Sequence, residues 1–461
     1  MIKEDKMTKI CFCGISGNGM SPLAQIMSLK GYEVLGSDRS FDAGRDAKNR
    51  QALIDMGIKL IPQDGSAITA DIDTIYVSAA LDENNPDIKA ARALNIPVKK
   101  RSDLLAELFA TYPFGIAVGG TSGKTTTTAM IGYILDMLGQ KPCMINGGML
   151  RNYEQLKGLP NFIYNQDKFC VIEADESDGS ICKYHPNVAL INNISHDHTS
   201  MENLLKYFTA FAANTKDALV VNYDCELTRN LHHAKKTVTF SVKDAAADFF
   251  ADKITCLPHG IEYNFRGQTF RLQLFGSFNV ANAMAAIAVC SEAGIDPLQA
   301  AKVLEGFSGI KRRLEIVGTT ADNITLIDDF AHNPSKIGSS LQALKEYSGR
   351  LIVMYQSHSP FSAYNTGDEV AQTVAKVLDD QDILLLPEVY MLDKNTDKGI
   401  TAENIVNAAK GYGLKNVFFL GTQAAVHDYI LEHAKAGDRV VIMGARDNSL
   451  PDFSRRLLKE L

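Results

Sequence analysis

The sequence predicts an α/β protein built from three domains in series, and three observations support this fold class. Short apolar segments of strand character alternate with helical stretches along most of the chain, which is the pattern of parallel sheets covered by helices. The length of 461 residues is about three times that of a typical domain. The alternation restarts near Pro113 and again after Gly318, so we place the domains at residues 1–108, 109–313 and 314–461.

The first domain is predicted to be a Rossmann-like parallel sheet. Helical stretches separate its apolar runs, and a strand that leads through a helix to the next strand produces parallel pairing. The expected strands are 9–15, 33–38, 59–62 and 74–79, and the expected helices are 21–31 and 44–57.

The second domain is predicted to be a P-loop ATPase-like α/β domain with additional antiparallel strands. A strand at 115–120 leads through a glycine-rich loop into a helix that begins near Thr125. Its later elements are expected to be strands at 169–175 and 188–194, a run of antiparallel strands within 248–276, and a buried helix at 279–294.

The third domain is predicted to be Rossmann-like again, because alternation of strands and helices resumes after 309–318. The expected strands are 324–330, 350–356, 382–389, 416–421 and 439–445, with a helix at 335–347.

The composition excludes several classes of function. The net charge of −7 gives no electrostatic reason to expect binding to nucleic acid. No segment approaches the roughly 20 apolar residues that span a bilayer, and the N-terminus lacks the apolar core of a signal peptide. We therefore expect a cytoplasmic protein without membrane insertion. The 8 scattered cysteines are expected to be reduced thiols rather than a zinc site.

A first glycine-rich turn follows the strand at 9–15 and opens a helix. Gly14, Gly17 and Gly19 would let the backbone approach a phosphate at the helix N-terminus. Their spacing differs from the dinucleotide pattern Gly-x-Gly-x-x-Gly, and a tight turn without a ligand is the alternative. Asp38 ends the next strand, where an acidic side chain could meet a ribose.

A second glycine-rich loop, GGTSGKTTTT, joins an apolar strand to a helix and predicts a phosphate-binding site. Its backbone N–H groups could surround phosphates, Lys124 could neutralise their charge, and the Thr125 hydroxyl could bind Mg²⁺. The strict phosphate-loop pattern requires glycine where this chain has Val118.

Polar side chains follow the next two strands of the predicted second domain. VIEADESDG supplies Glu173, Asp175, Glu176 and Asp178, and carboxylates commonly hold a magnesium ion against phosphates. INNISHDHTS supplies His198 with neighbouring polar residues. Because parallel strands carry their sites at their C-terminal ends, we expect these segments and the phosphate loop to share one edge of the sheet.

Six stretches of the chain resemble, in order and spacing, motifs of the Mur ligases, the ATP-dependent amide-forming enzymes of peptidoglycan synthesis. They are GTSGKTTTT, EADESD, NISHDH, GSFNVANAMAA, GIKRRLEIVG and DDFAHNPSKI. The N-terminal segments GISGNGMSPLAQIMSLKGYEVLGSD and SAALDENNPDIKAARALNIPVKKRSDLL are most similar to the branch that starts from UDP-N-acetylmuramate. The resemblance covers nearly the whole chain. The family does not require glycine at the position of Val118.

The resemblance implies roles for individual residues. Lys124, His198 and His332 would be catalytic, and Thr125, Glu173 and His198 would bind metal. The UDP-sugar would contact Gly14, Gly17, Gly19, Asp38 and Ser78. ATP would contact Gly120, Thr121, Ser122, Gly123, Lys124, Thr125, Thr126, Asn279, Asn282, Arg313 and Asp329.

The resemblance also implies substrates, cofactors and a reaction. ATP and two Mg²⁺ ions would activate the carboxylate of UDP-N-acetylmuramate as an acyl phosphate, and the amine of an amino acid, with L-alanine favoured, would then displace phosphate. Electrostatic stabilisation and positioning would carry both steps. The oligomeric state and the order of binding do not follow from the sequence.

Several residues differ from the pattern of the alanine-adding branch. Ser122 and Phe278 each stand where that branch has histidine. In YQSHSPF, Ser357 and Ser359 replace proline and arginine, which removes an arginine that could pair with a substrate carboxylate. Arg446 replaces a glycine in MGARDNSL. The alternative is therefore a ligase that adds a peptide, as in the recycling ligases, or another amino acid to UDP-N-acetylmuramate or to another acid.

Two other classes of protein stay open at this point. A dehydrogenase would use the first glycine turn for NAD. Two features argue against this class: the glycines of that turn do not have the dinucleotide spacing, and the second glycine-rich loop would have no use. A nucleotide-binding regulator without catalysis would have to explain why Lys124, Glu173 and His198 are all present.

Overall fold

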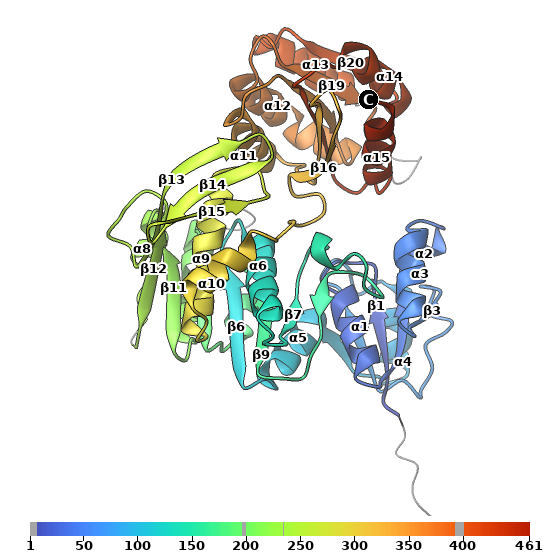
Figure 1. Cartoon of the computed structure of the whole chain (residues 1–461). Helices are drawn as coiled ribbons and strands as arrows, with labels where there is room; N and C mark the ends of the chain where they lie inside the picture. Colours follow the sequence, from blue (N-terminus) through green and yellow to red (C-terminus); the bar gives the residue numbers. More distant parts are fainter. Residues whose placement is uncertain (1–6, 196–199, 234, 392–400) are drawn as a thin grey trace, which may run out of the picture. The chain divides into compact units, whose positions relative to one another are not determined.

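The computed structural model describes residues 7–195, 200–233, 235–391 and 401–461. The chain forms two compact units, each continuous in space but not in sequence. The first unit consists of Met1–Asp252, Asn264–Phe270 and Val280–Ser308, and the second of Lys253–Tyr263, Arg271–Asn279 and Gly309–Leu461. Three sheets run through them in chain order, as the alternating sequence predicts (Figure 1).

The first sheet has five strands in the order β3-β2-β1-β4-β5, and all of its pairs are parallel. This is the Rossmann-like arrangement that the sequence predicts. The strands are β1 (Lys9–Cys13), β2 (Glu33–Ser37), β3 (Lys59–Ile61), β4 (Thr74–Val77) and β5 (Val98–Lys100). The helices are α1 (Ser21–Leu29), α2 (Arg39–Asp42), α3 (Ala47–Asp55), α4 (Pro86–Ala93) and α5 (Arg101–Ala110).

The second sheet has ten strands in the order β15-β14-β13-β12-β11-β10-β6-β9-β7-β8. Parallel pairs run from β13 through β7, while β8 is antiparallel to β7. The strands are β6 (Phe114–Gly119), β7 (Cys143–Ile145), β8 (Phe162–Ile163), β9 (Phe169–Glu173), β10 (Val188–Ile191), β11 (Ala218–Asn222), β12 (Thr237–Ser241), β13 (Phe249–Leu257), β14 (Gly260–Phe265) and β15 (Gln268–Leu272). The two-residue connections within β13–β15 are those of antiparallel hairpins, which agrees with the expected run.

Helices cover the second sheet and link it to the rest of the first unit. α6 packs on β6, β7 and β9, and α10 packs on α6. The α-helices are α6 (Lys124–Met137), α7 (Met201–Ala213), α8 (Glu226–Arg229), α9 (Phe278–Glu292) and α10 (Pro297–Leu304), with the short 3₁₀ turns η1 (Arg151–Tyr153) and η2 (Ser180–Lys183).

The third sheet has six strands in the order β16-β17-β21-β18-β19-β20, with only the edge strand β16 antiparallel to its neighbour. The strands are β16 (Glu315–Thr319), β17 (Thr325–Asp329), β18 (Leu351–Gln356), β19 (Ile383–Pro387), β20 (Val417–Gly421) and β21 (Arg439–Gly444). The helices are α11 (Pro334–Lys345), α12 (Pro360–Val377), α13 (Ala402–Gly411), α14 (Gln423–His433) and α15 (Leu450–Glu460).

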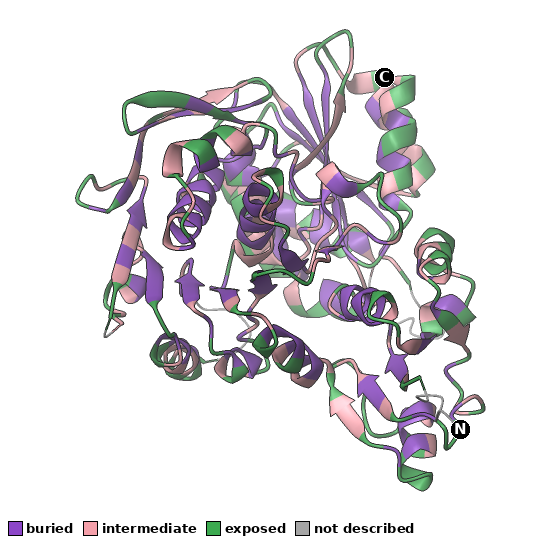
Figure 2. Ribbon diagram, turned by 60° about the horizontal axis from the view of Figure 1, so that its bottom comes forward, coloured by how far each residue is buried: buried purple, intermediate pink, exposed green. Residues whose placement is uncertain are grey.

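The central strands of the sheets form the cores of the two units. Figure 2 shows these strands as buried, with exposed residues gathered on the outer helices and turns. All eight cysteines are free, and Cys11 and Cys13 are buried in the same apolar cluster. Among the described residues no helix is both long and apolar enough to cross a bilayer.

The predicted domain boundaries fall close to element ends. α5 runs to Ala110, so the boundary after residue 108 cuts its last turn. The boundary after residue 313 lies just before β16, which begins at Glu315. The three ranges stay predictions, because the compact units divide the chain differently.

Candidate active site

The loop between β6 and α6 has the backbone of a phosphate-binding loop. Gly120 has φ of 130° and Gly123 has φ of 84°, values that residues with side chains rarely adopt. A Cβ on Gly123 would lie 2.5 Å from Asn192 Nδ2 and 2.7 Å from Asn282 Oδ1. Because the loop leads straight into α6, the first N–H groups of that helix are available to an anion.

Val118 fits the strand rather than the loop. It is fully buried on β6, paired with Leu190 of β10 on one side and with Glu173 of β9 on the other. An apolar, β-branched side chain suits this central position in a parallel sheet. The departure from the strict phosphate-loop pattern therefore lies outside the turn that would hold phosphates.

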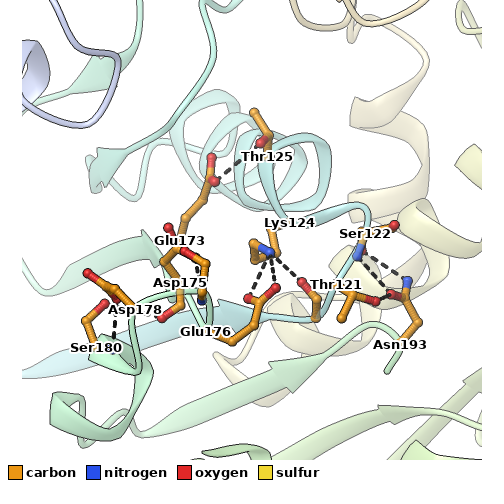
Figure 3. Close-up of polar contacts among 12 residues, drawn as sticks. Thr121, Ser122, Lys124, Thr125, Glu173, Asp175, Glu176, Asp178, Ser180 and Asn193 are labelled. Atoms are coloured by element: carbon orange, nitrogen blue, oxygen red, sulfur yellow. Dashed lines mark hydrogen bonds and ion pairs between the residues drawn. The ribbon is translucent and has the colours of Figure 1, made fainter. Parts of the chain in front are cut away.

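Lys124, the first residue of α6, is held by two partners (Figure 3). Its Nζ donates to the carbonyl oxygen of Gly120 at 2.6 Å and pairs with both carboxylate oxygens of Glu176 at 2.9 Å. The side chain of Glu176 is only 3% exposed. Burial raises the pKa of Glu176 above its ordinary value, although the ammonium group of Lys124 opposes this.

Asp175, next to Glu176, is ionised more readily than an ordinary aspartate. Burial alone would raise its pKa, but the N–H of Ser177 and the charge of Lys124 lower the pKa below the usual value. The two adjacent carboxyl groups thus differ in acidity, and Asp175 loses its proton at a lower pH than Glu176.

Thr125 and Glu173 meet at the edge of the sheet where β6 and β9 end (Figure 3). The Thr125 hydroxyl donates to Glu173 Oε2 at 3.3 Å, and Glu173 Oε1 accepts from the N–H of Gly147 at 2.6 Å. A hydroxyl beside a carboxylate is the kind of oxygen pair that binds Mg²⁺ together with substrate phosphates and water. Among the described residues no group of three or more His, Cys, Asp and Glu side chains forms a complete metal cage.

Asn193, just beyond β10, fastens the phosphate loop from the other side (Figure 3). Its Oδ1 accepts from the Thr121 hydroxyl and from the N–H of Ser122, both at 2.8 Å, and its Nδ2 donates to the Ser122 carbonyl at 3.0 Å. The Thr121 hydroxyl also accepts from the N–H of Ser195 at 3.1 Å. These bonds fix the shape of the loop.

A second asparagine, Asn192, lies beneath the loop. Its Nδ2 donates to Thr127 Oγ1 at 3.0 Å and to Asn282 Oδ1 at 3.1 Å. Asn192, Thr127 and Asn282 are all at most 6% exposed. This buried network joins β10, α6 and α9 directly under Gly123, so the loop rests on a rigid base.

The first glycine turn of the chain is also built for close approach. Gly14 has φ of 80°, and a Cβ there would lie 3.1 Å from Ser78 Cβ. A Cβ on Gly19 would lie 3.1 Å from Arg101 Cδ, which places this arginine over the turn. Gly17 closes the turn by donating from its N–H to the carbonyl of Gly14 at 3.2 Å.

Asp38 holds the same turn in place. Its Oδ2 accepts from the N–H of Ser16 at 2.9 Å, and its Oδ1 accepts from the N–H of Ser40 at 2.8 Å, which caps α2. With 7% exposure Asp38 is buried, and both of its carboxylate oxygens hold the turn through these backbone bonds.

In the second unit, two buried aspartates end β17. Arg312 pairs with Asp328, its Nε donating to Oδ1 at 3.2 Å, and its Nη2 donates to the carbonyl of Gly444 at 2.6 Å. Burial raises the pKa of Asp328 to about 6 in spite of this arginine, and burial also raises the pKa of Asp329. The guanidinium of Arg313 lies 5.7 Å from the centre of the Phe330 ring.

Two histidines pack edge to face beside these aspartates. The rings of His332 and His358 are 5.1 Å apart, and burial lowers the pKa of both. The pKa of His358 falls to about 4, with His332 and Arg446 contributing after burial. His332 Nδ1 lies 2.9 Å from the carbonyl of Phe330, which can only accept, so Nδ1 carries the proton and Nε2 keeps its lone pair.

Family models match all three parts of the chain. The model described as "Mur ligase family, catalytic domain" covers residues 9–113, "Mur ligase middle domain" covers 118–290, and "Mur ligase, glutamate ligase domain" covers 312–446. A UDP-N-acetylmuramate--L-alanine ligase of Solibacter usitatus is 32% identical over 94% of this chain and 92% of its own length.

The chain belongs to the Mur ligase family.

This Mur ligase has further relatives of the same kind. A UDP-N-acetylmuramate--L-alanine ligase of a Sulfurihydrogenibium species is 31% identical over 99% of the chain and 98% of its own length. The crystal structure of a UDP-N-acetylmuramate-alanine ligase of Thermotoga maritima has a TM-score of 0.81 at 27% identity, covering 98% of each chain. A murein peptide ligase of Psychrobacter arcticus has a TM-score of 0.69 at 25% identity, also covering 98% of each chain. The chain is an ATP-dependent ligase, and its three-domain α/β fold is confirmed.

The predicted nucleotide-site and metal-site residues of this Mur ligase lie in the first unit, in the second unit, or outside the described residues. The phosphate loop, Lys124, Thr125 and Glu173 come together in the first unit, with Thr126 partly exposed on the first turn of α6. Asn282 lies below the loop, whereas Asn279 is in the second unit, where its Nδ2 donates to the carbonyl of Phe275 at 2.7 Å. His198 lies outside the described residues.

The sequence did not assign roles to several residues that shape the site. Glu176 and Asn193 stood in recognised motifs, but their contacts with Lys124 and with the loop depend on folding. Arg101 was missed, although it directly follows β5, at the sheet edge where parallel strands carry ligands. Asn192 was missed because a buried asparagine after a strand gives no distinctive pattern.

Proposed function

We propose that this protein joins the carboxylate of UDP-N-acetylmuramate to the amine of L-alanine with consumption of ATP, in the synthesis of peptidoglycan precursors. The observation that carries the proposal is the phosphate loop with Lys124, Thr125 and Glu173 in reach of one another. The full-length relatives named UDP-N-acetylmuramate--L-alanine ligase support the choice of substrates. Because these substrates include nucleotides of the cell interior, we place the reaction in the cytoplasm.

The proposed nucleotide site uses the loop Gly120–Thr126 for the phosphates of ATP, with Asn282 of the same unit beneath it. The roles of Asn279, Arg313 and Asp329 toward the rest of the nucleotide stay predictions from the sequence. Thr125 and Glu173 fit one Mg²⁺, since their oxygens lie 3.3 Å apart and hard cations prefer oxygen ligands. A second Mg²⁺ would use His198. Bound magnesium would neutralise charge on the transferred phosphate.

The proposed UDP-sugar site lies at the first glycine turn. Gly14, Gly17 and Gly19 leave room for the diphosphate, while Asp38 and Ser78 border the turn. Arg101, which lies over Gly19, adds a positive charge on this side. A guanidinium fork suits a diphosphate better than a lysine would.

The reaction follows from these groups. A carboxylate does not condense with an amine directly, because hydroxide is a poor leaving group. The muramate carboxylate attacks the terminal phosphate of ATP, which forms an acyl phosphate and releases ADP. The amine nitrogen then attacks the acyl carbon, loses a proton, and expels inorganic phosphate. Lys124 stabilises the negative charge that moves between phosphate oxygens in both steps.

His332 is the proposed acceptor of the amine proton. Its Nδ1 proton is engaged with the Phe330 carbonyl, which leaves Nε2 free to accept. Because burial lowers its pKa, the ring is neutral at pH 7 and able to take up a proton. Lys336, Arg313 and Arg446 add to this lowering.

The amine site offers one specific reason to consider a second acceptor. Ser359 caps α12 by accepting from the N–H of Ser362 at 3.1 Å, so it contributes no charge to a substrate carboxylate. Arg446 is exposed in a left-handed conformation, φ 64°, and its charge reaches His332 and His358. We propose that Arg446 receives the carboxylate of the acceptor. An exposed arginine also suits a longer acceptor, so a peptide ligase is the second candidate.

The test is a ligation assay with ATP, Mg²⁺, UDP-N-acetylmuramate and each acceptor in turn, namely L-alanine, glycine, L-serine and the tripeptide L-alanyl-γ-D-glutamyl-diaminopimelate. Phosphate release and product mass are measured together. We expect release that depends on L-alanine, with a product heavier by one alanyl residue. Release that depends only on the tripeptide would select the second candidate, and no amine-dependent release would refute both.

A variant tests the assignment of the nucleotide site. Lys124→Ala is expected to lower turnover at least a thousandfold while UDP-N-acetylmuramate still binds, because the lysine acts on ATP phosphates only. Lys235→Ala is the matched control, since Lys235 is an exposed lysine of the same unit, paired with Asp217. Loss of UDP-sugar binding in Lys124→Ala would show that the two substrates are assigned to the wrong parts of the chain.

A further inference from the structure

A cavity of about 240 Å³ lies within the second unit, at the edge of the third sheet where the parallel strands begin. Thr325 and Arg439, the first residues of β17 and β21, pair with each other and both line the cavity. His332 and Arg446 instead follow the C-terminal ends of β17 and β21, and His358 follows that of β18. Strands of five or six residues span roughly 17–20 Å, so the cavity is separate from the proposed amine site.

Arg439 is the unusual residue of this cavity. It is only 6% exposed, and its guanidinium lies 5.2 Å from the ring centre of Tyr347 and 5.9 Å from that of Phe275. Within the described residues its side chain has no carboxylate partner and donates no hydrogen bond, and its Nε and Nη1 are fully buried. A Cβ on Gly349 would lie 3.1 Å from Nη1, so glycine keeps this space open.

The other charges of the cavity cancel. Arg350 donates from Nη2 to Asp438 Oδ2 at 2.5 Å and from Nε to Oδ1 at 3.2 Å. Asp438 Oδ2 also accepts from the N–H of Lys435 at 2.8 Å, so this carboxylate is engaged with Arg350 and the backbone rather than with Arg439. Burial raises the pKa of the adjacent Tyr347, which keeps this phenol neutral. The cavity therefore has one uncompensated positive charge, surrounded by the polar side chains of Asn323, Thr325 and Ser348.

An arginine that is buried without hydrogen bonds is costly, because both its charge and its N–H groups have left water. Aromatic rings compensate part of the charge but satisfy none of the donors. Because Nε and Nη1 are fully buried, Nη2 is the nitrogen of Arg439 that can meet an oxyanion, through a charge-assisted hydrogen bond. The cavity is smaller than the roughly 300–1,000 Å³ of pockets for drug-sized ligands, which limits the occupant to a small molecule or one terminal group.

We propose that this cavity is a binding site for a small oxyanion, a phosphate or a carboxylate, that is held by Arg439. Pro258, in the turn between β13 and β14, lines the same cavity as Gly349 and Gly437 of the third-sheet region. A bound anion would therefore tie that turn to the sheet. The site is independent of the ligation reaction, since none of its lining residues belongs to the proposed nucleotide, UDP-sugar or amine sites.

The experiment is calorimetric titration of the full-length protein with inorganic phosphate and, separately, with succinate, at constant ionic strength set with sodium chloride. Four chains are compared. Arg439→Gln removes the charge, Ala436→Leu adds bulk at the exposed rim of the cavity and leaves Arg439 in place, and Arg455→Gln removes an exposed arginine of α15 as a control. Circular dichroism checks that each variant is folded.

We expect at least one anion to bind wild type and Arg455→Gln alike, and to bind Arg439→Gln and Ala436→Leu at least tenfold more weakly. Phosphate held at the nucleotide site would bind all four chains equally, so it cannot imitate this result. If Arg439→Gln does not fold, Ala436→Leu decides the question alone. Equal binding by all chains, or no binding of either anion to wild type, would overturn the proposal and leave the cavity to water.

Discussion

Asp328→Asn separates two opposite effects on one buried carboxylate. Arg312 attracts the negative charge of Asp328 at 3.2 Å, whereas burial of a side chain that is only 1% exposed disfavours that charge. Burial dominates, since the pKa of Asp328 rises from 3.8 to about 6. At about 1.4 kcal/mol for each pH unit, the ionised carboxylate costs about 3 kcal/mol of folding free energy at neutral pH.

The direction of the pH dependence follows from the raised pKa. A carboxyl group with a raised folded-state pKa stabilises the fold fully below its unfolded pKa of about 3.8, and this contribution is lost as the pH rises through about 6. An asparagine cannot ionise and keeps an oxygen for Arg312. Relative to wild type, Asp328→Asn should therefore gain about 3 kcal/mol between pH 4 and pH 7.

The assay is urea denaturation followed by circular dichroism at several pH values, with hydrogen exchange of β18 as a readout confined to the second unit. Asp322→Asn, an exposed aspartate of the same unit, is the control and should show no such trend. If wild type instead gains stability relative to Asp328→Asn as the pH rises, the attraction of Arg312 exceeds the cost of burial and the reasoning is refuted.

Three further predictions concern the sites themselves. Gly123→Ala should abolish ATP binding in a calorimetric titration while the circular dichroism spectrum is kept, because its Cβ would lie 2.5 Å from Asn192 Nδ2; normal binding would show that the loop shifts easily. Asn193→Ala should raise KM for ATP about tenfold or more with a smaller change in kcat, since it removes hydrogen bonds that shape the loop; an unchanged KM in steady-state assays would contradict this. His358→Gln should lose less stability than wild type when the pH is lowered from 6.5 to 4, as measured by urea denaturation. The pKa of His358 is lowered to about 4 in the folded protein, so its contribution to stability is present above pH 6.5 and is lost as the pH falls through 4. Identical pH profiles of the two proteins would count against this prediction.

Local sequence was sufficient to predict the elements around the nucleotide site. The strand, the glycine-rich loop and the helix at Lys124 follow one another directly, and parallel pairing then places Glu173 at the same sheet edge. The prediction that these residues share one edge is confirmed. Val118 departs from the motif only because the first two positions of the pattern, 118 and 119, are the last two residues of strand β6.

Other contacts depend on residues far apart in the chain, and no local pattern records them. Asn193 meets Ser122 across 71 residues, and Glu176 meets Lys124 across 52. Arg439 looks like an ordinary strand residue, and only the positions of Asp438, Tyr347 and Phe275 reveal that it has no carboxylate partner among the described residues. The sequence also does not predict how residues of one compact unit contribute to a site in the other. The roles of Asn279, Arg313 and Asp329 toward ATP therefore stay predictions.

The pairing of Lys124 with Glu176 bears on how quickly the protein can exchange nucleotides. Lys124 has a buried carboxylate as its counter-ion, so an arriving phosphate has to replace a resident anion. The carboxylate is ready to recapture the lysine once the reaction is over. We expect this exchange to weaken equilibrium binding of ADP and to shorten its residence time, so that a loop shaped to grip phosphates still releases its spent product between turnovers.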